Sequence, residues 1–301
     1  MPQASLIELP IAEPAFDPSL LEVKERSLLG ALRSLGSVVI GFSGGVDSTL
    51  LLACAKEALG SDKVMAVIGI SETYPERELQ EAMRLADLIG IPYRTVRTEE
   101  TDVLKFQENP PDRCYYCKTE LFSKLEPIRD SLGFSHVIDG TNLDDLGEFR
   151  PGTRARTEQE VLSPLANANL TKSEIRELSR RRGLPTSEKP SYACLSSRFP
   201  YHTSIDKAKL KRIDAAENLL YDLGFKVVRV RYHDDKTARV EIGVKEFAKL
   251  LAEDVRLAVV EGLKSLGFVY ITLDLQGFRS GSMNEVLTED EKQSYLSPTK
   301  N

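Results

Sequence analysis

The sequence predicts an α/β protein in which a doubly wound parallel sheet is followed by a smaller α+β domain. Two patterns support this prediction. Through about the first two hundred residues, short apolar segments rich in β-branched residues alternate with amphipathic segments, as in successive βαβ units. Beyond them, strand-like segments alternate apolar with polar residues, which is typical of a sheet with one solvated face.

The first part of the chain contains four expected strands and four expected helices. The first strand ends at Gly41, and the apolar helix after Ser48 ends at Gly60, because glycine commonly terminates helices and strands. Thr171 is the expected cap of the fourth helix. The remaining strands are expected at residues 63–70, 91–98 and 136–142, and the remaining helices at residues 76–89, 117–132 and 171–183.

The second part begins with a helix that starts near Ser204. Alternating residues then predict strands at 226–233 and 238–243, a helix at 245–266 and a strand at 268–277.

These elements divide the chain into three expected regions. The first twenty residues contain four prolines and no basic segment, so we expect a loosely ordered arm rather than a signal peptide. The regions are a loosely ordered arm at 1–26, a nucleotide-binding domain at 27–200 and an α+β substrate-binding or oligomerisation domain at 201–301.

Charge and hydropathy exclude two classes of function. A net charge of −6 argues against stable, nonspecific binding to nucleic acid, because phosphate backbones are bound by clustered lysines and arginines. No stretch approaches the ~20 apolar residues that a membrane helix needs. We therefore expect a cytoplasmic protein with no membrane partner.

A Ser-Gly-Gly-Val-Asp-Ser turn lies between the first strand and the first apolar helix. The unpaired N–H groups and the dipole of a helix N-terminus attract an anion, and Gly44 and Gly45 let a phosphate approach the backbone. Ser43 and Ser48 add hydroxyl donors, and Asp47 can either cap the helix or hold Mg²⁺. The Gly-Lys-Ser/Thr ending of a Walker A loop is missing. The turn therefore predicts a phosphate site of another kind, with an ordinary capped turn as the alternative.

Four cysteines suggest a metal or a catalytic site rather than a disulfide framework. Cys54 lies in the apolar helix and is expected in the core. Cys114 and Cys117 are two residues apart just before a helix, and Cys194 lies in a later loop. Three interpretations remain open: a redox pair, a zinc site completed by His202, and a four-iron four-sulfur cluster held by three thiolates.

The turn resembles the signature of the PP-loop ATP pyrophosphatases, whose fold is like that of the adenine nucleotide alpha hydrolases. From about residue 29 to residue 283 the chain resembles one family of that group, the LarE ATP-dependent sulfur transferases. The motifs that carry this resemblance are FSGGVDSTLL, CYYCK, DGTNLDD, RPG, CLSSRFPYHT, RVRYH and LDLQGFRSG.

The resemblance implies a reaction and a substrate. ATP adenylates a carboxylate of pyridinium-3,5-biscarboxylic acid mononucleotide with release of pyrophosphate, and sulfur then replaces AMP. The product leads to the nickel-pincer cofactor of lactate racemase. Mg²⁺ and arginines would neutralise the phosphate charge. The resemblance also implies a homo-oligomer and an external sulfide or sulfur donor.

Two sulfur sources are implied by relatives. In one type, the cysteine that matches Cys194 gives up its own sulfur and becomes dehydroalanine. In the other type, three cysteines hold a cluster whose open iron carries the extra sulfide. Because this chain also has Cys114 and Cys117, the resemblance favours the cluster type.

Other site residues follow from the matching motifs. Asp47, Asp139 and Asp145 are candidates to hold Mg²⁺. Arg229 and Arg231 are two apart on a strand and therefore point to the same face. The candidates to bind the substrate phosphate and carboxylates are Ser197, Arg198, Glu217, Arg229, Arg231 and Arg279.

Three alternative functions stay open. A tRNA thiolase would also use three cysteines, but it would need a basic surface. An ammonia-using PP-loop synthetase would not need Cys114, Cys117 or Cys194. A nucleotide-binding regulatory subunit would need no turnover at all.

Overall fold

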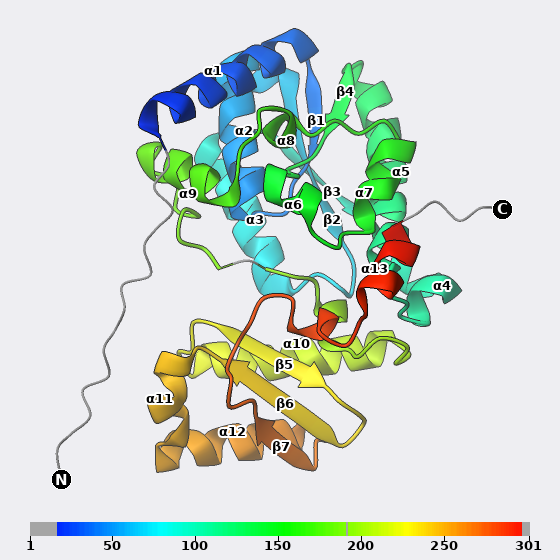
Figure 1. Ribbon diagram of the computed structural model, residues 1–301, viewed down its shortest axis with the longest axis vertical. Coiled ribbons are helices and arrows are strands. Elements are labelled where there is room, and N and C mark those ends of the chain that lie inside the picture. The colour runs from blue at the N-terminus through cyan, green and yellow to red at the C-terminus, as the bar shows by residue number, and fades with distance from the viewer. Residues whose placement is uncertain (1–16, 191, 297–301) are drawn as a thin grey trace.

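The computed structural model describes residues 17–190 and 192–296. It contains two domains of different size, each built from a β-sheet and helices, and the larger domain lies above the smaller one in Figure 1. Residues 18–26, which the sequence assigns to a loosely ordered arm, form the first half of a helix, α1 (Pro18–Leu35). Asp17 caps this helix, and residues 1–16 of the expected arm lie outside the described residues.

The first domain is built on a four-stranded parallel sheet with the order β3-β2-β1-β4. This confirms the predicted α/β class. The four strands lie at the expected places, and the last three are shorter than predicted, above all β4. Their bounds are β1 Val38–Gly41, β2 Val64–Ile70, β3 Tyr93–Arg97 and β4 His136–Ile138.

Helices cover both faces of this sheet, as a doubly wound fold requires. One face packs against α1, α2, α3, α8 and α9, and the other packs against α5 and α7. The bounds of these helices and of the two short ones are α2 Val46–Leu59, α3 Glu76–Ile89, α4 Leu104–Gln107, α5 Arg113–Leu132, α6 Leu143–Gly147, α7 Gly152–Glu158, α8 Pro164–Asn167 and α9 Lys172–Arg181.

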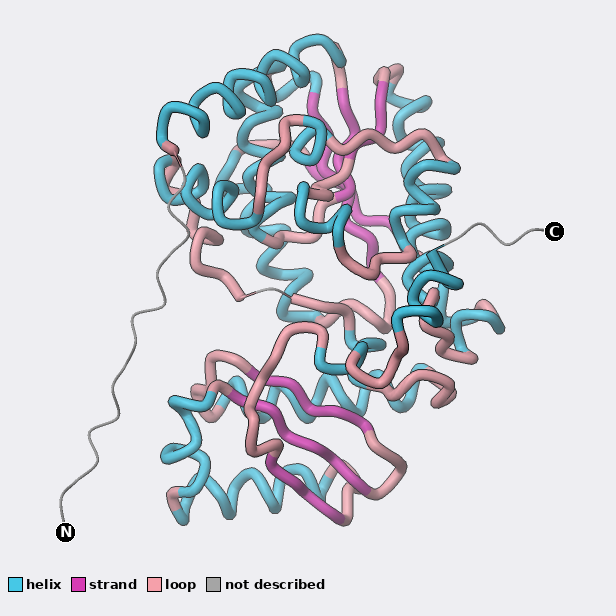
Figure 2. The backbone as a smooth tube through the Cα atoms, viewed as in Figure 1, coloured by secondary structure: helices cyan, strands magenta, loops and turns pink. Residues whose placement is uncertain are grey.

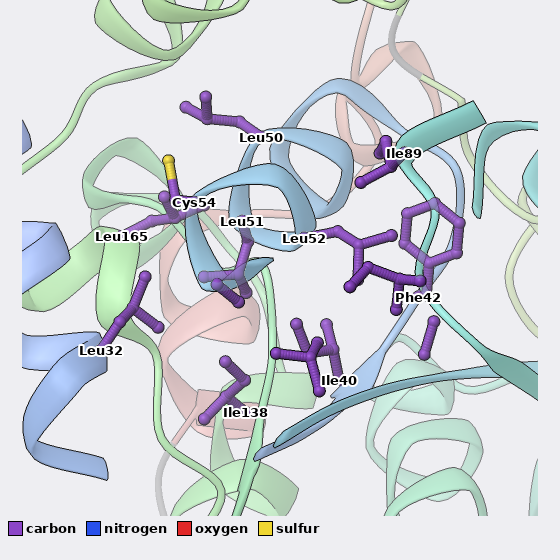
Figure 3. Close-up of a cluster of buried hydrophobic side chains, with 14 of the residues drawn as sticks. Leu32, Ile40, Phe42, Leu50, Leu51, Leu52, Cys54, Ile89, Ile138 and Leu165 are labelled. Atoms are coloured by element: carbon purple, nitrogen blue, oxygen red, sulfur yellow. The ribbon is translucent and has the colours of Figure 1, made fainter. Parts of the chain in front are cut away.

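The core on the first face explains the apolar helix after the Ser-Gly-Gly turn. Leu50, Leu51 and Leu52 are buried on three sides of α2, because α2 lies between the sheet and the outer helices (Figure 3). Cys54 is fully buried in the same cluster, which confirms its predicted place in the core. Burial raises the pKa of its thiol to about 12.

The second domain contains a mixed three-stranded sheet with the order β5-β6-β7. Strands β5 and β6 are antiparallel, and β6 and β7 are parallel. The predicted helix at 245–266 is interrupted and forms two helices. The bounds are α10 Lys207–Asp222, β5 Val228–Tyr232, β6 Thr237–Ile242, α11 Phe247–Leu251, α12 Glu253–Ser265, β7 Tyr270–Leu273 and α13 Glu289–Leu296.

The expectation of one solvated sheet face is wrong for β5. All five of its residues are buried, including Arg229 and Arg231, which each expose 5% of their surface. The two arginines share a face, as predicted, but buried carboxylates and the segment around Ser282 cover that face. Alternation of polar and apolar residues in a strand shows that its two faces differ in chemistry, and in β5 both faces are buried.

A long loop joins the two domains. Figure 2 shows it between α9 and α10, with the short 3-10 turn η3 (Leu195–Arg198) near its end. Within the described segments, no helix combines the length and the apolar character needed to cross a bilayer.

Candidate functional site

The Ser-Gly-Gly-Val-Asp-Ser turn joins the end of β1 to the start of α2, as the sequence predicts. Gly44 has a φ of +62°, and a Cβ there would lie 3.0 Å from the backbone and side chain of Ala82 in α3. Only glycine fits this position without strain. The hydroxyl oxygens of Ser43 and Ser48 lie 3.2 Å apart. The tight turn therefore holds both hydroxyls beside the N-terminus of α2.

A second loop packs directly on this helix N-terminus. A Cβ on Gly140, just after β4, would lie 3.0 Å from the backbone nitrogen of Ser48. Parallel strands end at the same edge of a sheet, so the loops after β1 and β4 meet there. Gly140 stands in the DGTNLDD motif, but its role depends on a close approach that the sequence alone does not contain.

Asp47 does not cap α2. The cap residue is Gly45, and no side chain in the described segments caps this helix. The Asp47 carboxylate instead accepts hydrogen bonds from Lys172 Nζ at 2.5 Å and from Asn142 Nδ2 at 3.3 Å. The capping interpretation is therefore wrong, because α9 and the loop after β4 supply partners that the sequence spacing does not reveal.

The other two candidate magnesium ligands already have close partners. Asp139 accepts hydrogen bonds from the hydroxyls of Thr141 at 2.7 Å and Ser163 at 2.6 Å. Asp145 forms an ion pair with Arg150 at 2.9 Å. Burial, and to a smaller extent the charge of Asp47, raises the pKa of the Asp145 carboxyl. Asp47 and Asp145 are thus electrostatic neighbours, whereas Asp139 is held by hydroxyls.

The cysteines come from two segments that face each other. Cys114 and Cys117 lie in the first turns of α5, which begins four residues earlier than predicted, and not in a loop before it. Because the two cysteines are three residues apart, both lie on one side of the helix. Cys114 is exposed and Cys117 is half-buried. Desolvation by the surrounding groups, and to a smaller extent the charge of Cys194, raises the pKa of both thiols. Cys194 is therefore an electrostatic neighbour of both.

All four cysteines are free thiols. Across residues 17–190 and 192–296, no group of three or more Cys, His, Asp or Glu side chains is arranged to hold a metal ion. The three thiols are close enough to influence one another, but neither a zinc site with His202 nor a cluster site is assembled in this arrangement. The three magnesium candidates do not form one group either.

The turn that carries Cys194 is fixed from both sides. The amide of Leu195 donates to the carbonyl of Thr73, which follows β2, at 2.9 Å. The carbonyl of Cys194 accepts hydrogen bonds from Ser197 Oγ at 2.8 Å and from Arg198 Nη1 at 2.9 Å. Cys194 is therefore held between the first domain and the arginines of the second.

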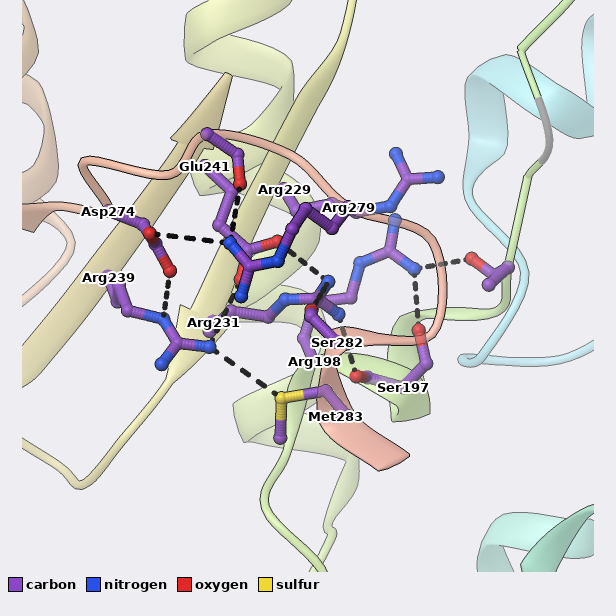
Figure 4. A network of polar contacts seen from close by, with 12 residues as sticks. Ser197, Arg198, Arg229, Arg231, Arg239, Glu241, Asp274, Arg279, Ser282 and Met283 are labelled. Carbon is purple, nitrogen blue, oxygen red and sulfur yellow. Dashed lines mark hydrogen bonds and ion pairs between the residues drawn. The ribbon is translucent and has the colours of Figure 1, made fainter. Parts of the chain in front are cut away.

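Arg198 and Glu217 form a buried ion pair, and Figure 4 shows Arg198 beside Ser197 and the arginines of the second domain. Arg198 is fully buried, and its Nε and Nη2 donate to the two oxygens of Glu217 at 2.8 Å each. The amide of Val230 donates to the same carboxylate at 2.9 Å. This two-point pairing fixes the guanidinium plane, so Arg198 is a rigid part of the site.

The remaining arginines extend this network along β5. Burial, and then repulsion from Arg198, lowers the pKa of Arg229. Arg231 donates to Glu241 at 2.7 Å and to the carbonyl of Ser197 at 3.0 Å. Arg279 lies farther out, 3.3 Å from a Glu285 oxygen. Arg198 and Arg229 are therefore two buried neighbouring cations, between which an anion would be stabilised.

A cavity of about 180 Å³ lies between the start of α3 and the segment around Lys189 on one side and α10 and β5 on the other. We call this cavity the cleft. Lys189 lines it and donates to the carbonyl of Gly44 at 3.2 Å and to Glu78 at 2.7 Å. Tyr192 lines it too, with its ring 5.4 Å from the Arg198 guanidinium and 5.6 Å from that of Arg229. From the second domain the lining includes Asp214, Glu217, Asn218, Tyr221, Lys226 and Arg229.

Several of these residues were missed by the sequence reasoning. Lys189 and Tyr192 stand directly before the quoted CLSSRFPYHT motif, and that proximity is the one signal that could have indicated them. Glu78 and Lys172 carry no local signal, because they lie on other helices; Lys172 contacts Asp47 of the turn, and Glu78 pairs with Lys189.

Comparisons with known proteins find relatives of part of the chain and relatives of nearly all of it. Residues 27–119 match the family model for NAD synthase. A pyridinium-3,5-bisthiocarboxylic acid mononucleotide synthase of Lactiplantibacillus plantarum is 38% identical over 91% of this chain and 99% of its own length. An uncharacterized protein of Synechocystis is 41% identical over 90% of this chain and 100% of its own. An ammonia-dependent NAD⁺ synthetase of Methanococcoides burtonii is 28% identical over 50% of this chain and 58% of its own.

Proposed function

The chain belongs to the LarE family of ATP-dependent sulfur transferases, and from this premise we propose that it converts pyridinium-3,5-biscarboxylic acid mononucleotide to the bisthiocarboxylic form. Its relative from L. plantarum is the synthase of that product. The product would serve the nickel-pincer cofactor of lactate racemase. We further propose a cytoplasmic homo-oligomer, as the family resemblance implies.

The observation that supports this proposal best is the order of groups along the cleft. Lys189 lines the cleft at one end and contacts Gly44 of the turn to which we assign phosphate binding. The buried Arg229 lines its other end, and the Cys194 turn is hydrogen-bonded to Thr73 of the first domain and to Arg231 of the second. An enzyme that first activates a carboxylate with ATP and then attacks it with sulfur needs these three parts in one place.

In the first step a substrate carboxylate oxygen attacks the α-phosphorus of ATP, and pyrophosphate leaves. We propose that Ser43, Gly44, Gly45 and Ser48 bind the pyrophosphate through backbone N–H groups and hydroxyls. The arginines would bind the substrate through its phosphate and its second carboxylate. Buried guanidinium groups suit this task, because they stay charged and each offers a fixed set of donors.

PP-loop enzymes use Mg²⁺ with ATP, and the ion neutralises the phosphate charge. Asp47 and Asp145 suit this ion by their donor chemistry, because Mg²⁺ prefers carboxylate oxygens and keeps several waters. The two carboxylates are neighbours beside the phosphate turn. Asp139 was the third candidate, and its hydroxyl partners would have to be displaced first.

In the second step sulfur displaces AMP. We propose that Cys194 delivers it, either as its own sulfur or as extra sulfur carried on the three-cysteine site. Three thiolates are the usual donor type for an iron–sulfur cluster, but the arrangement of the described residues offers no assembled metal site. No step of this proposal therefore depends on a cluster.

The first test is a reaction of the purified protein with ATP, Mg²⁺ and the biscarboxylated mononucleotide. We expect AMP and pyrophosphate, together with a product in which sulfur replaces carboxylate oxygen, detected by mass spectrometry. The variant with Cys114, Cys117 and Cys194 all replaced by serine should still form the acyl adenylate but transfer no sulfur. Product formation by that variant in the presence of ammonia would instead identify an amide-forming synthetase.

Iron and sulfide analysis of anaerobically purified protein decides the sulfur source. A visible iron–sulfur band that Cys114→Ala abolishes would identify a cluster carrier. Iron-free protein with dehydroalanine at position 194 after the reaction would identify Cys194 as the expended donor. Salt-sensitive binding of tRNA would favour the thiolase alternative over both.

A further inference from the structure

Lys189 is a cation of the cleft that none of the steps proposed above uses. Its side chain exposes 18% of its surface and lines the cleft. Its Nζ donates to the carbonyl of Gly44 at 3.2 Å and to a Glu78 oxygen at 2.7 Å. One hydrogen bond therefore reaches the turn to which we assign pyrophosphate binding, and the other fixes the ammonium group to α3.

The backbone around Lys189 is fixed as well. Its amide donates to the carbonyl of Thr186 at 3.0 Å, and its carbonyl accepts a hydrogen bond from Arg176 Nη2 of α9 at 2.8 Å. Arg176 also donates to the carbonyl of Ser187 at 2.5 Å. The first domain therefore holds the lysine beside the turn before any ligand arrives. A group that is already in place loses little conformational freedom when it binds.

The ammonium group of Lys189 has one donor to spare. An ammonium group carries three N–H donors, and Gly44 and Glu78 accept hydrogen bonds from two of them. It makes no third hydrogen bond to any residue in the segments that the structure describes. One N–H of a charged group is therefore left for a ligand in the cleft, and an anionic oxygen forms the strongest hydrogen bond to it.

The position of Lys189 along the cleft indicates which anionic oxygen this is. The turn would hold pyrophosphate, and Arg229 lines the other end of the cleft, where we place the substrate. The α-phosphorus of ATP is bonded to pyrophosphate and is attacked by the substrate carboxylate, so it must lie between these two ends. Arg77, another lining cation from the first domain, pairs with Asp222 of α10. Lys189 is the lining cation that is hydrogen-bonded to the turn.

We propose that Lys189 binds the α-phosphate of ATP and stabilises the charge that develops there when the substrate carboxylate attacks. The inference rests on the proposed function, because it assumes that ATP is split between its α- and β-phosphates. The carboxylate oxygen forms a bond to the α-phosphorus, the bond to the pyrophosphate oxygen breaks, and pyrophosphate leaves with the electron pair. Lys189 keeps its protons throughout. It remains on the phosphate of the acyl adenylate and so also holds AMP, the leaving group of the second step.

The first test is isotope exchange between pyrophosphate and ATP in the presence of the biscarboxylated mononucleotide. Lys189→Met should lower the exchange rate by about a hundredfold or more, the loss usual for one donor to a charge that develops in the transition state. Lys24→Met is the matched control. Lys24 pairs with Glu174 at 2.7 Å and exposes 17% of its side chain, but it joins α1 to α9 outside the cleft. This variant should exchange like the wild type.

Binding without the mononucleotide separates the α-phosphate contact from a structural role. Calorimetry should show that Lys189→Met weakens the binding of ATP by about tenfold, the loss expected for one charge-assisted contact. The binding of inorganic pyrophosphate, which has no α-phosphate, should stay unchanged. Circular dichroism shows whether each variant is folded, and Lys189→Gln replaces the methionine variant if that one is not.

Three outcomes would overturn the inference. These are wild-type exchange in Lys189→Met, an equal loss of exchange in Lys24→Met, and equal weakening of ATP and pyrophosphate binding. A wild type without any exchange that depends on the mononucleotide would count against the proposed function instead. The binding comparison still tests the lysine in that case, because it needs neither the mononucleotide nor turnover.

Discussion

The two ends of the cleft are built in opposite ways. At the phosphate end, one hexapeptide supplies a glycine turn, two hydroxyls and a helix N-terminus, all within six consecutive residues. At the arginine end, Arg198, Glu217 and Arg229 come from a loop, a helix and a strand. The first end depends on local backbone geometry and the second on buried charge. From this difference we predict which property, activity or stability, a substitution at each end reduces.

Cys194→Ala should have the largest effect, because it removes the sulfur atom between the two ends and leaves both intact. We expect sulfur transfer to fall by about a thousandfold or more, as when a nucleophile is removed. Acyl-adenylate formation, measured as ATP–pyrophosphate exchange with the substrate, should stay near the wild-type rate. A parallel loss of exchange would mean that Cys194 helps to build the adenylation site.

Glu217→Ala breaks the arginine end. It leaves the guanidinium of Arg198 buried without its carboxylate, which costs about 3–5 kcal/mol of unfolding free energy. Chemical denaturation followed by circular dichroism measures this cost. The double variant Arg198→Met, Glu217→Leu should recover most of the loss, because it removes both charges. If the double variant were less stable than the single one, the pair would not act through its charges.

Gly44→Ala breaks the phosphate end. The positive φ and the 3.0 Å approach to Ala82 should cost about 1–3 kcal/mol. ATP binding, measured by calorimetry, should weaken more than this stability loss suggests, because the strain lies in the turn that we propose to bind phosphate. Gly133→Ala is the control, since Gly133 also has a positive φ but has no atoms near its would-be Cβ. Equal ATP affinities in the two variants would contradict this role for Gly44.

The pH dependence of stability gives a smaller effect, which depends on the buried, neutral thiol of Cys54 in the core. Its pKa is raised from about 9 to about 12, so the unfolded chain loses its proton first as the pH rises. Its contribution to stability is complete below pH 9 and is lost between pH 9 and pH 12, at about 1.4 kcal/mol per pH unit. The unfolding free energy of the wild type should therefore fall more steeply over this range than that of Cys54→Ala. Parallel curves would show that the thiol ionises in the folded state.

The contrast also explains what could be predicted from the sequence. Strands β1 to β4 and the phosphate turn were predictable, because apolar periodicity and the glycine turn are local signals. The burial of Arg229 and Arg231 was not, because alternation in β5 looks the same whether a polar face meets water or buried carboxylates. The pairing of Asp47 with Lys172 was also hidden, because 125 positions separate the two residues.

The hydrogen bond from Leu195 to Thr73 has a mechanical consequence. It ties the Cys194 turn to the loop after β2, while Arg198 ties the same turn to the second domain. A body that swings about a fixed point moves least at that point. If the second domain rotates relative to the first, the arginines travel and the phosphate turn stays, but the sulfur remains near the pivot. Under the proposed function, such a rotation would leave the sulfur of Cys194 in place while the groups that we assign to the two reactants move around it.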